Sequence, residues 1–376
     1  MRDQTKIVIE EPDESTGAIT TPIYQTSSYV LPIGEKYRYT REKNPTVEKL
    51  EQKLSEIENA EASTAFSSGM ASISTTLLNF LKPGKTLMIQ KGIFARTYRF
   101  CMDFLTSLNI RVDAVNPDTE SIEEALKSRK YDVIFLESIT NPLVRVIDLP
   151  RIAKVAKEMG SIVVVDSTLS TPINQRVLDQ GADVDVESAS KFISGHNDVI
   201  AGFAAGRKDY ITQIDSLRRT LGGSLDPHSA YLVIRGLKTL KVRMDVINRN
   251  ALKIAEFLDD HPKIKFVYYP GLRDNPDYDI ATRILKGFGG IVSFELRGTK
   301  NDVLSMFNKL KIIKVSQTFG GVNSVISHPM TMTHRSLNLD EMKEAGITEN
   351  LIRLSVGIED VDDLIEDLDS ALKSFR

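Results

Sequence analysis

Hydrophobic and polar positions divide the chain into short strand-like and helix-like segments that alternate from residue 46 onward. A helix is predicted to begin near Thr46, because apolar residues recur at three- and four-residue spacing along one face (Val47, Leu50, Leu54 and Ile57). Strand-like runs are predicted at Thr86–Gln90, 110–115, 132–137, Ile162–Asp166, 183–186 and 199–204, with helical stretches between most of them. This alternation favours an α/β fold, with a mostly parallel sheet covered by helices on both faces.

The pattern changes near residue 227, where a long helical stretch is predicted over 227–258. Beyond it, strands are expected at 264–269, Ile291–Leu296, 312–315 and 351–356, and helices at 302–310 and 361–374. This order suggests a smaller C-terminal α+β domain. Residues 1–45 carry several prolines and tyrosines. They are expected to form an irregular arm that packs against protein surface and does not extend freely into solvent. We therefore predict an arm (1–45), an α/β domain (46–230) and a C-terminal α+β domain (231–376).

Composition narrows the class of protein only moderately. The chain has 376 residues, enough for two packed cores, and its formal net charge of −3 indicates neither a nucleic-acid nor an anionic-membrane partner. Cys101 is the single cysteine, so an internal disulfide is impossible and a reducing compartment is expected. No apolar run approaches the roughly 18 residues of a membrane span, and the N-terminus lacks an apolar signal-peptide core. We expect a soluble cytoplasmic protein.

Lys191 is the first candidate for chemistry. It follows the predicted strand 183–186 within Ser188-Ala189-Ser190-Lys191. Burial lowers the pKa of an amine and frees its lone pair, and an amine in that state forms Schiff bases. Pyridoxal phosphate (PLP) enzymes hold their cofactor in this way. A surface lysine after a strand is the simpler interpretation of this run on its own.

Three further segments carry weaker signals, each with an ordinary structural alternative. Ser67-Ser68-Gly69-Met70 opens a helix expected to run to about Phe80, where backbone N–H groups suit a phosphate; an ordinary serine-capped helix fits as well. Asp166 ends a buried strand, where ligands sit in open α/β sheets, and it could equally cap a helix. Arg353 lies within an apolar strand and needs an anionic partner, either a substrate carboxylate or a structural acid.

Other motifs are absent or incomplete. Gly84-Lys85-Thr86 ends like a phosphate-binding loop, but Asn79 stands where the first glycine belongs. The chain contains no G-x-G-x-x-G run, and its five histidines form no zinc-binding pattern, so no metal is expected. Cys101 lies among Phe100, Met102 and Phe104 in a predicted helix, which favours a core position.

Taken in order, many short motifs resemble the Cys/Met-metabolism family of fold-type I PLP-dependent enzymes. The resemblance runs from about Thr16 to the C-terminus. The matching motifs are Tyr39-Thr40-Arg41, Asn44-Pro45-Thr46, Ser68-Gly69-Met70, Glu137-Ser138-Ile139-Thr140-Asn141-Pro142, Val165-Asp166-Ser167-Thr168, Ser188-Ala189-Ser190-Lys191, Gly195-His196, Arg235-Gly236-Leu237-Lys238-Thr239-Leu240, Tyr269-Pro270-Gly271-Leu272, Met332-Thr333-His334 and Arg353-Leu354-Ser355-Val356-Gly357.

The resemblance implies a role for individual positions. Lys191 resembles the Schiff-base lysine and Asp166 the partner of the cofactor's pyridine nitrogen. Phosphate ligands are implied at Gly69, Met70, Ser188 and Ser190, a neighbour of the phenolic oxygen at Asn141, and substrate carboxylate binding at Arg353. Tyr39 and Arg41 are implied to reach the phosphate of a neighbouring subunit. The resemblance thus implies a dimer with shared active sites, usually paired into a tetramer.

Departures from the family pattern are as informative. Phe94 stands where the family usually has a tyrosine that stacks on PLP, and it has no hydroxyl for proton transfer near the leaving group. Gln317, next to Thr318, stands where the family's cystathionine lyases have a glutamate that meets the distal ammonium of the substrate, and we count both residues as candidate substrate-binding positions. Ser167 replaces the family's asparagine.

The resemblance implies γ-elimination or γ-replacement on sulfur amino acids or homoserine esters, as in cystathionine γ-synthase or γ-lyase. A β-eliminating cystathionine β-lyase is the alternative within the enzyme class. β-Elimination needs no second proton shift, so it depends less on a tyrosine at position 94. A catalytically silent PLP-fold binding protein is the alternative from another class, disfavoured by the retention of Lys191, Asp166 and Arg353. ATP binding, suggested only by Gly84-Lys85-Thr86, is weaker still.

Overall fold

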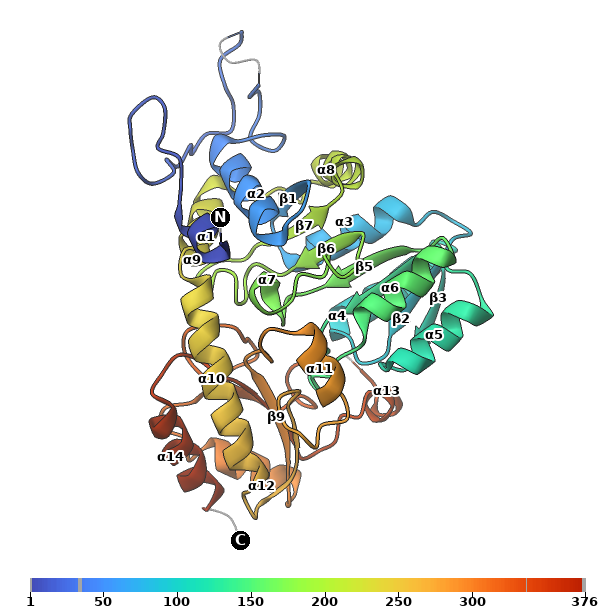
Figure 1. Cartoon of the computed structure of the whole chain (residues 1–376), viewed down its shortest axis with the longest axis vertical. Coiled ribbons are helices and arrows are strands. Elements are labelled where there is room, and N and C mark those ends of the chain that lie inside the picture. The colour runs from blue at the N-terminus through green and yellow to red at the C-terminus, as the bar shows by residue number, and fades with distance from the viewer. Residues whose placement is uncertain (1, 33–35, 336, 374–376) are drawn as a thin grey trace.

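Two β-sheets and the helices packed on them make up the computed structural model, which describes residues 2–32, 36–335 and 337–373 (Figure 1). The first sheet has the order β1-β7-β6-β5-β4-β2-β3 in these residues. Its strands are β1 (Ala62–Phe66), β2 (Thr86–Gln90), β3 (Arg111–Val115), β4 (Val133–Glu137), β5 (Ile162–Asp166), β6 (Val184–Glu187) and β7 (Gly202–Gly206). The pairs from β3 to β6 are parallel, whereas β7 is antiparallel to both β6 and β1. The predicted mostly parallel sheet is confirmed.

Helices cover both faces of this sheet because its central strands are apolar on both sides. In β4, Val133 and Phe135 pack into one buried cluster, and Ile134 and Leu136 pack into another. The first cluster includes residues of α3, η1 and α8, and the second includes residues of α5 and α6. The helices of this part are α1 (Asp3–Val8), α2 (Pro45–Glu58), α3 (Gly69–Phe80), α4 (Ala95–Arg99), η1 (Phe100–Leu105), α5 (Thr119–Ser128), α6 (Leu149–Glu158), α7 (Thr171–Asn174), α8 (Lys208–Leu221) and α9 (Pro227–Leu237).

The second sheet has the order β10-β11-β12-β9-β8 and is mostly antiparallel. Its strands are β8 (Ile264–Tyr268), β9 (Ile291–Leu296), β10 (Lys314–Val315), β11 (Val325–Ser327) and β12 (Leu351–Ser355). The long helix α10 (Leu240–Asp259) runs from the first sheet to the second, which it covers together with α12 (Lys300–Phe307) and α14 (Val361–Leu372) (Figure 1). Two shorter helices, α11 (Tyr278–Ile284) and α13 (Leu339–Glu344), complete this part.

Several predicted elements need correction. The arm is not wholly irregular, because α1 forms where Ile7 is buried and Lys53 Nζ donates to the carbonyls of Lys6 and Ile9. The strand predicted at 199–204 is β7, which begins only at Gly202, because the Ala201 backbone is bonded to the Ser190 hydroxyl instead. Strands β1 and β11 were not predicted.

The helical stretch 227–258 is two helices, α9 and α10, because the Gly236 carbonyl accepts from the Arg243 guanidinium (2.8 Å) across the break. The strand predicted at 312–315 shrinks to β10, since the backbone N–H groups of 311–313 donate to the Asp367 carboxylate. The helix predicted over 361–374 ends at Leu372, and Ser374 lies outside the described residues. None of the helices in the described residues combines the length and the apolar character needed to cross a membrane.

Candidate active site

A cavity of about 500 Å³ lies at the carboxyl ends of β4, β5 and β6 and extends to residues of the second sheet. Ligands bind at this edge in open α/β sheets, because the loops that follow the strands converge there. All of the candidate site residues except Tyr39 and Arg41 line this one cavity. They are Gly69, Met70, Phe94, Asn141, Asp166, Ser188, Ser190, Lys191, Gln317, Thr318 and Arg353.

Lys191 lies in the loop after β6, half-buried in the cavity wall. Its Nζ donates to Thr318 Oγ1 (3.2 Å) and lies 4.9 Å from the centre of the Phe319 ring. Burial, and then the positive charge of Arg353, lower the pKa of Lys191 to about 8. A substantial fraction of this amine is therefore neutral at mildly alkaline pH and able to attack a carbonyl carbon or accept a proton.

Asp166 and Glu137 are register partners at the ends of β5 and β4. Asp166 Oδ1 accepts the Thr168 N–H (3.0 Å), and Glu137 Oε1 accepts the Phe94 N–H (2.7 Å). Burial raises the pKa of Asp166 to about 6, and burial together with the Asp166 charge raises the pKa of Glu137 well above its usual value. Two acids in this position would be stabilised in their ionised form by a cationic N–H group in the cavity.

The N-terminus of α3 forms one wall of the cavity. Ser68 caps this helix by accepting the Ala71 N–H (3.1 Å), and the N–H groups of Gly69 and Met70 belong to the first turn, which has no intrahelical acceptors. A Cβ at Gly69 would lie 2.7 Å from the Ser188 Cβ, so a side chain there would collide with the opposite wall. This close approach leaves the helix end open to an anion.

Ser188 and Ser190 lie across from the helix end. The Ser190 hydroxyl donates to the Ala201 carbonyl (3.1 Å) and accepts the Ala201 N–H (2.9 Å), so it is held in place by backbone groups. The backbone N–H of Ser188 donates to Thr168 Oγ1 (2.9 Å). The two serines are thus positioned on rigid segments beside the N–H groups of α3, an arrangement that suits a phosphate.

Arg353 is only 2% exposed and lies in the middle of β12. Its guanidinium donates to Asn141 Oδ1 (3.2 Å) and to the carbonyls of Gln317 (2.9 Å) and Thr318 (3.0 Å), and its Nε has no partner. No carboxylate of the described residues forms an ion pair with it, so the structural-acid alternative is wrong for this part of the chain. Burial lowers its pKa to about 10. The site therefore holds a buried positive charge that an incoming anion would compensate.

The sequence of the chain matches a known protein family over almost its whole length. A sequence model described as Cys/Met metabolism PLP-dependent enzyme matches residues 4–373. The chain belongs to this family. Cystathionine gamma-lyase of Bacillus subtilis (strain 168) is 39% identical over 369 aligned residues, which cover 96% of each chain. L-methionine gamma-lyase of Fusobacterium nucleatum subsp. polymorphum is also 39% identical, with 96% of this chain and 94% of that protein covered.

Solved structures of the Cys/Met-metabolism family agree with the fold. Cystathionine gamma synthase from Xanthomonas oryzae pv. oryzae, in complex with cystathionine, superimposes with a TM-score of 0.96 at 34% identity, covering 99% of this chain and 98% of that one. The family prediction, the fold class and the PLP cofactor that the family uses are confirmed.

Tyr39 and Arg41 lie outside the cavity that the other candidates share. Tyr39 is 43% exposed, and the Arg41 guanidinium lies over its ring (5.4 Å) and donates to the Arg219 carbonyl (3.0 Å). Neither residue contributes to the cavity of its own chain, so their role at a neighbouring subunit's phosphate stays a prediction.

Several cavity residues had no role assigned from the sequence. Glu137 could have been noticed from the sequence, because both Glu137 and Asp166 are acids at the end of a buried apolar strand. The two strands, β4 and β5, are neighbours. Phe319, whose ring faces both Lys191 and Arg353, and the exposed Arg96 and Arg335 gave no such signal, because their places depend on loops that only the folded chain brings together.

Proposed function

We propose that this protein uses PLP to act on sulfur amino acids or homoserine esters by γ-elimination or γ-replacement, as a cystathionine γ-synthase or γ-lyase type of enzyme. The observation that carries the proposal is that Lys191 and the buried Arg353, which forms no ion pair with an acid of the described residues, line one cavity. An amine with a lowered pKa beside a carboxylate-binding guanidinium is what chemistry at the α-carbon of an amino acid requires.

The cavity fits PLP at each of its reactive groups. Lys191 would hold the aldehyde carbon, Asp166 would face the ring nitrogen, and Asn141 would lie beside the phenolic oxygen. The N–H groups of Gly69 and Met70, with Ser188 and Ser190, would hold the phosphate, and Phe94 would stack on the ring. When bound, PLP supplies an electron sink that makes the α-proton of an amino acid removable.

The protein's own groups would then orient the substrate and move protons. Arg353 would fix the α-carboxylate through its free hydrogen-bonding capacity, with Asn141 and the 317–318 carbonyls holding the guanidinium in place. Lys191 would accept the α-proton, and Thr318 Oγ1, 3.2 Å from its Nζ, would orient the amine. Gln317 and Thr318 would contact the distal part of the substrate, and Phe94 would exclude water without donating a proton.

The assembly we propose is a dimer with shared active sites, paired into a tetramer, in the cytoplasm. Tyr39 and Arg41 would reach the phosphate in the neighbouring subunit. Large apolar side chains in the N-terminal arm are exposed, among them Ile19 (82%) and Val30 (74%), which supports a subunit contact over the arm. Under this proposal the arm comprises residues 1–45, the PLP-binding domain 46–230 and the C-terminal domain 231–376.

Incubation of the purified protein and PLP with cystathionine tests the reaction type. Release of 2-oxobutyrate, identified by mass spectrometry, is the expected result for γ-cleavage. Pyruvate instead would establish β-cleavage and replace the proposal by the cystathionine β-lyase alternative, which the missing hydroxyl at Phe94 favours. If no keto acid forms, an O-acylhomoserine with cysteine must yield cystathionine; failure of both assays would contradict the proposal.

Phe94→Tyr is expected to raise kcat for γ-elimination by about 10-fold or more, because it restores a proton donor and acceptor near the leaving group. Steady-state kinetics on the γ-cleaved substrate measures the effect. Phe104→Tyr, at an exposed position outside the cavity, is the control and should leave kcat unchanged. An unchanged or lower kcat in Phe94→Tyr would show that the hydroxyl is not what limits proton transfer.

A further inference from the structure

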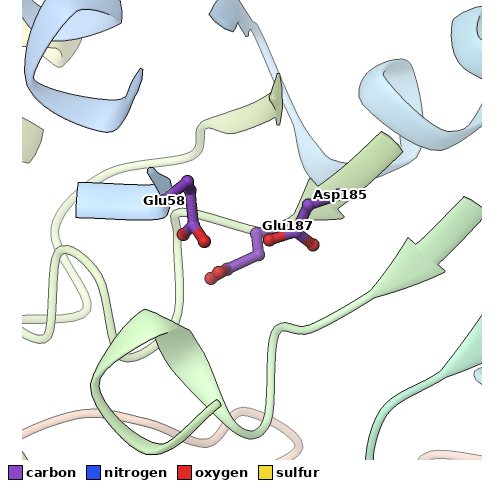
Figure 2. Close-up of side chains that lie close together, drawn as sticks. All are labelled: Glu58, Asp185 and Glu187. Atoms are coloured by element: carbon purple, nitrogen blue, oxygen red, sulfur yellow. The ribbon is translucent and has the colours of Figure 1, made fainter. Parts of the chain in front are cut away.

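A second polar cluster lies in the core of the first sheet, outside the PLP cavity. Glu58 at the end of α2 and Asp185 and Glu187 on β6 direct their carboxyl groups toward one another (Figure 2). One oxygen of each residue lies within 4.8 Å of those of the other two, and all three side chains are buried. Three carboxyl groups from two elements are thus brought to one point without access to water.

Hydrogen bonding in the described residues does not satisfy this cluster. The Ser167 hydroxyl lies 2.7 Å and 2.9 Å from the two Asp185 oxygens and 2.9 Å from Glu187 Oε1, but it has one proton to donate. Apart from one another's carboxyl groups, neither oxygen of Glu58 nor Oε2 of Glu187 has a hydrogen-bond partner in the described residues. A buried carboxylate oxygen without a donor is costly, so these atoms must either share a proton between the carboxyl groups or bind a cation.

The cluster is not part of any ion pair seen in residues 2–32, 36–335 and 337–373. None of the ion pairs formed by the described residues includes Glu58, Asp185 or Glu187, in contrast to Asp215, which pairs with Arg218 and Arg219. Burial, and then the charge of neighbouring carboxylates of the cluster, raise the pKa of Glu58 and Glu187 well above the usual range. Burial, and then the charge of Asp166, raise the pKa of Asp185 to about 8. The repulsion can be relieved by protons or by a bound cation.

The ligand type restricts the class of cation that could bind, and the spacing sets an upper limit on the distances between its ligands. Carboxylate oxygens are ligands for hard cations, and two ligands on opposite sides of an ion are separated by twice the metal–oxygen distance. That limit is about 4.2 Å for Mg²⁺ and roughly 4.6–5.2 Å for Ca²⁺. Oxygens that all lie within 4.8 Å of one another can surround a hard divalent cation, and Ca²⁺, with the longer metal–oxygen distance, serves as the probe.

We propose that Glu58, Asp185 and Glu187 form a buried binding site for a hard divalent cation such as Ca²⁺. The three residues would supply carboxylate oxygens, including those of Glu58 and Oε2 of Glu187, and the ion would offset two of the three negative charges. The site joins α2 to β6. A bound ion would stabilise the folded chain, because it binds the folded chain and not the unfolded one.

Metal content and thermal stability of the PLP-loaded protein test the site independently of turnover. The protein is dialysed against a chelator and then against CaCl₂, and bound metal is measured by inductively coupled plasma mass spectrometry. We expect one equivalent of Ca²⁺ per chain after CaCl₂ and a Tm higher by about 5 °C than after the chelator. Glu58→Gln and Glu187→Gln should lose both the ion and the Tm response.

Glu51→Gln is the matched control, because Glu51 lies on the same helix and accepts the Ala65 N–H (2.9 Å) outside the cluster. It should retain the Ca²⁺ equivalent and the Tm response. Two results would overturn the proposal: wild-type protein that binds no Ca²⁺ and whose Tm ignores CaCl₂, or Ca²⁺ bound equally by the Glu58 and Glu187 variants. The first of these results comes from wild-type protein alone, so it can be obtained even if a variant fails to fold. The first result would mean that protons neutralise the carboxyl groups.

Discussion

Replacing Lys191 by alanine is expected to lower turnover by at least about 10³-fold while leaving PLP bound without a covalent link. The substitution removes the amine that would accept the α-proton, whereas the phosphate-binding wall at the start of α3 and the acid at Asp166 remain. Initial rates with the γ-cleaved substrate, together with the visible spectrum before and after gel filtration, measure the two effects separately.

Lys208→Ala serves as the control, because Lys208 is an exposed lysine on α8. It should keep both full turnover and covalently held cofactor. Near-normal activity of Lys191→Ala would remove Lys191 from the mechanism and would leave the lowered pKa of its amine without a function.

Arg353→Met is expected to lower kcat/KM by on the order of 10²–10³-fold, because a buried charged partner of the substrate carboxylate is lost. The folded protein itself should lose little stability. The guanidinium has no acidic partner in the described residues, its Nε is unpaired, and burial already lowers its pKa to about 10. Kinetics and thermal unfolding of the same preparation measure the two quantities.

Arg243→Met gives the matched comparison for a buried arginine. Arg243 donates to the carbonyls of Phe192 (2.6 Å), Ile193 (3.0 Å) and Gly236 (2.8 Å) and does not line the cavity, and burial lowers its pKa to about 10 as well. We expect Arg243→Met to lower Tm more than Arg353→Met does. If Arg353→Met instead unfolded the protein and left kcat/KM unchanged, Arg353 would be a structural residue.

Much of the fold and most of the site could be predicted because their signals are local. The strands Thr86–Gln90 and Ile162–Asp166 are runs of apolar residues bounded by polar ones, and both were predicted with their observed ends. Asp166 and Lys191 come at or after the ends of parallel strands, which meet at one edge of the sheet, and Arg353 interrupts an apolar strand of the second sheet that borders the same cavity. The resemblance to the family supplied the roles, which these local signals alone left open.

What could not be predicted depends on distant partners. The alternation of Asp183 to Val186 suggests a strand with one polar face toward water, yet β6 lies inside the sheet and buries Asp185 and Glu187 with Glu58. Strand β1 has small or polar residues at all positions before Phe66, and it pairs with β7, far along the chain. The absence of an acid beside Arg353 depends on which loops surround β12.

The most direct test of the account is to locate the covalently held cofactor. The PLP-loaded protein is reduced with borohydride and digested with trypsin, and the peptides are analysed by mass spectrometry. Trypsin does not cleave at a modified lysine, so we predict a phosphopyridoxyl adduct on the undivided peptide 177–207, whose only internal lysine is Lys191. An adduct on another lysine, or none at all in protein that retains PLP, would contradict the assignment of this cavity as the PLP site.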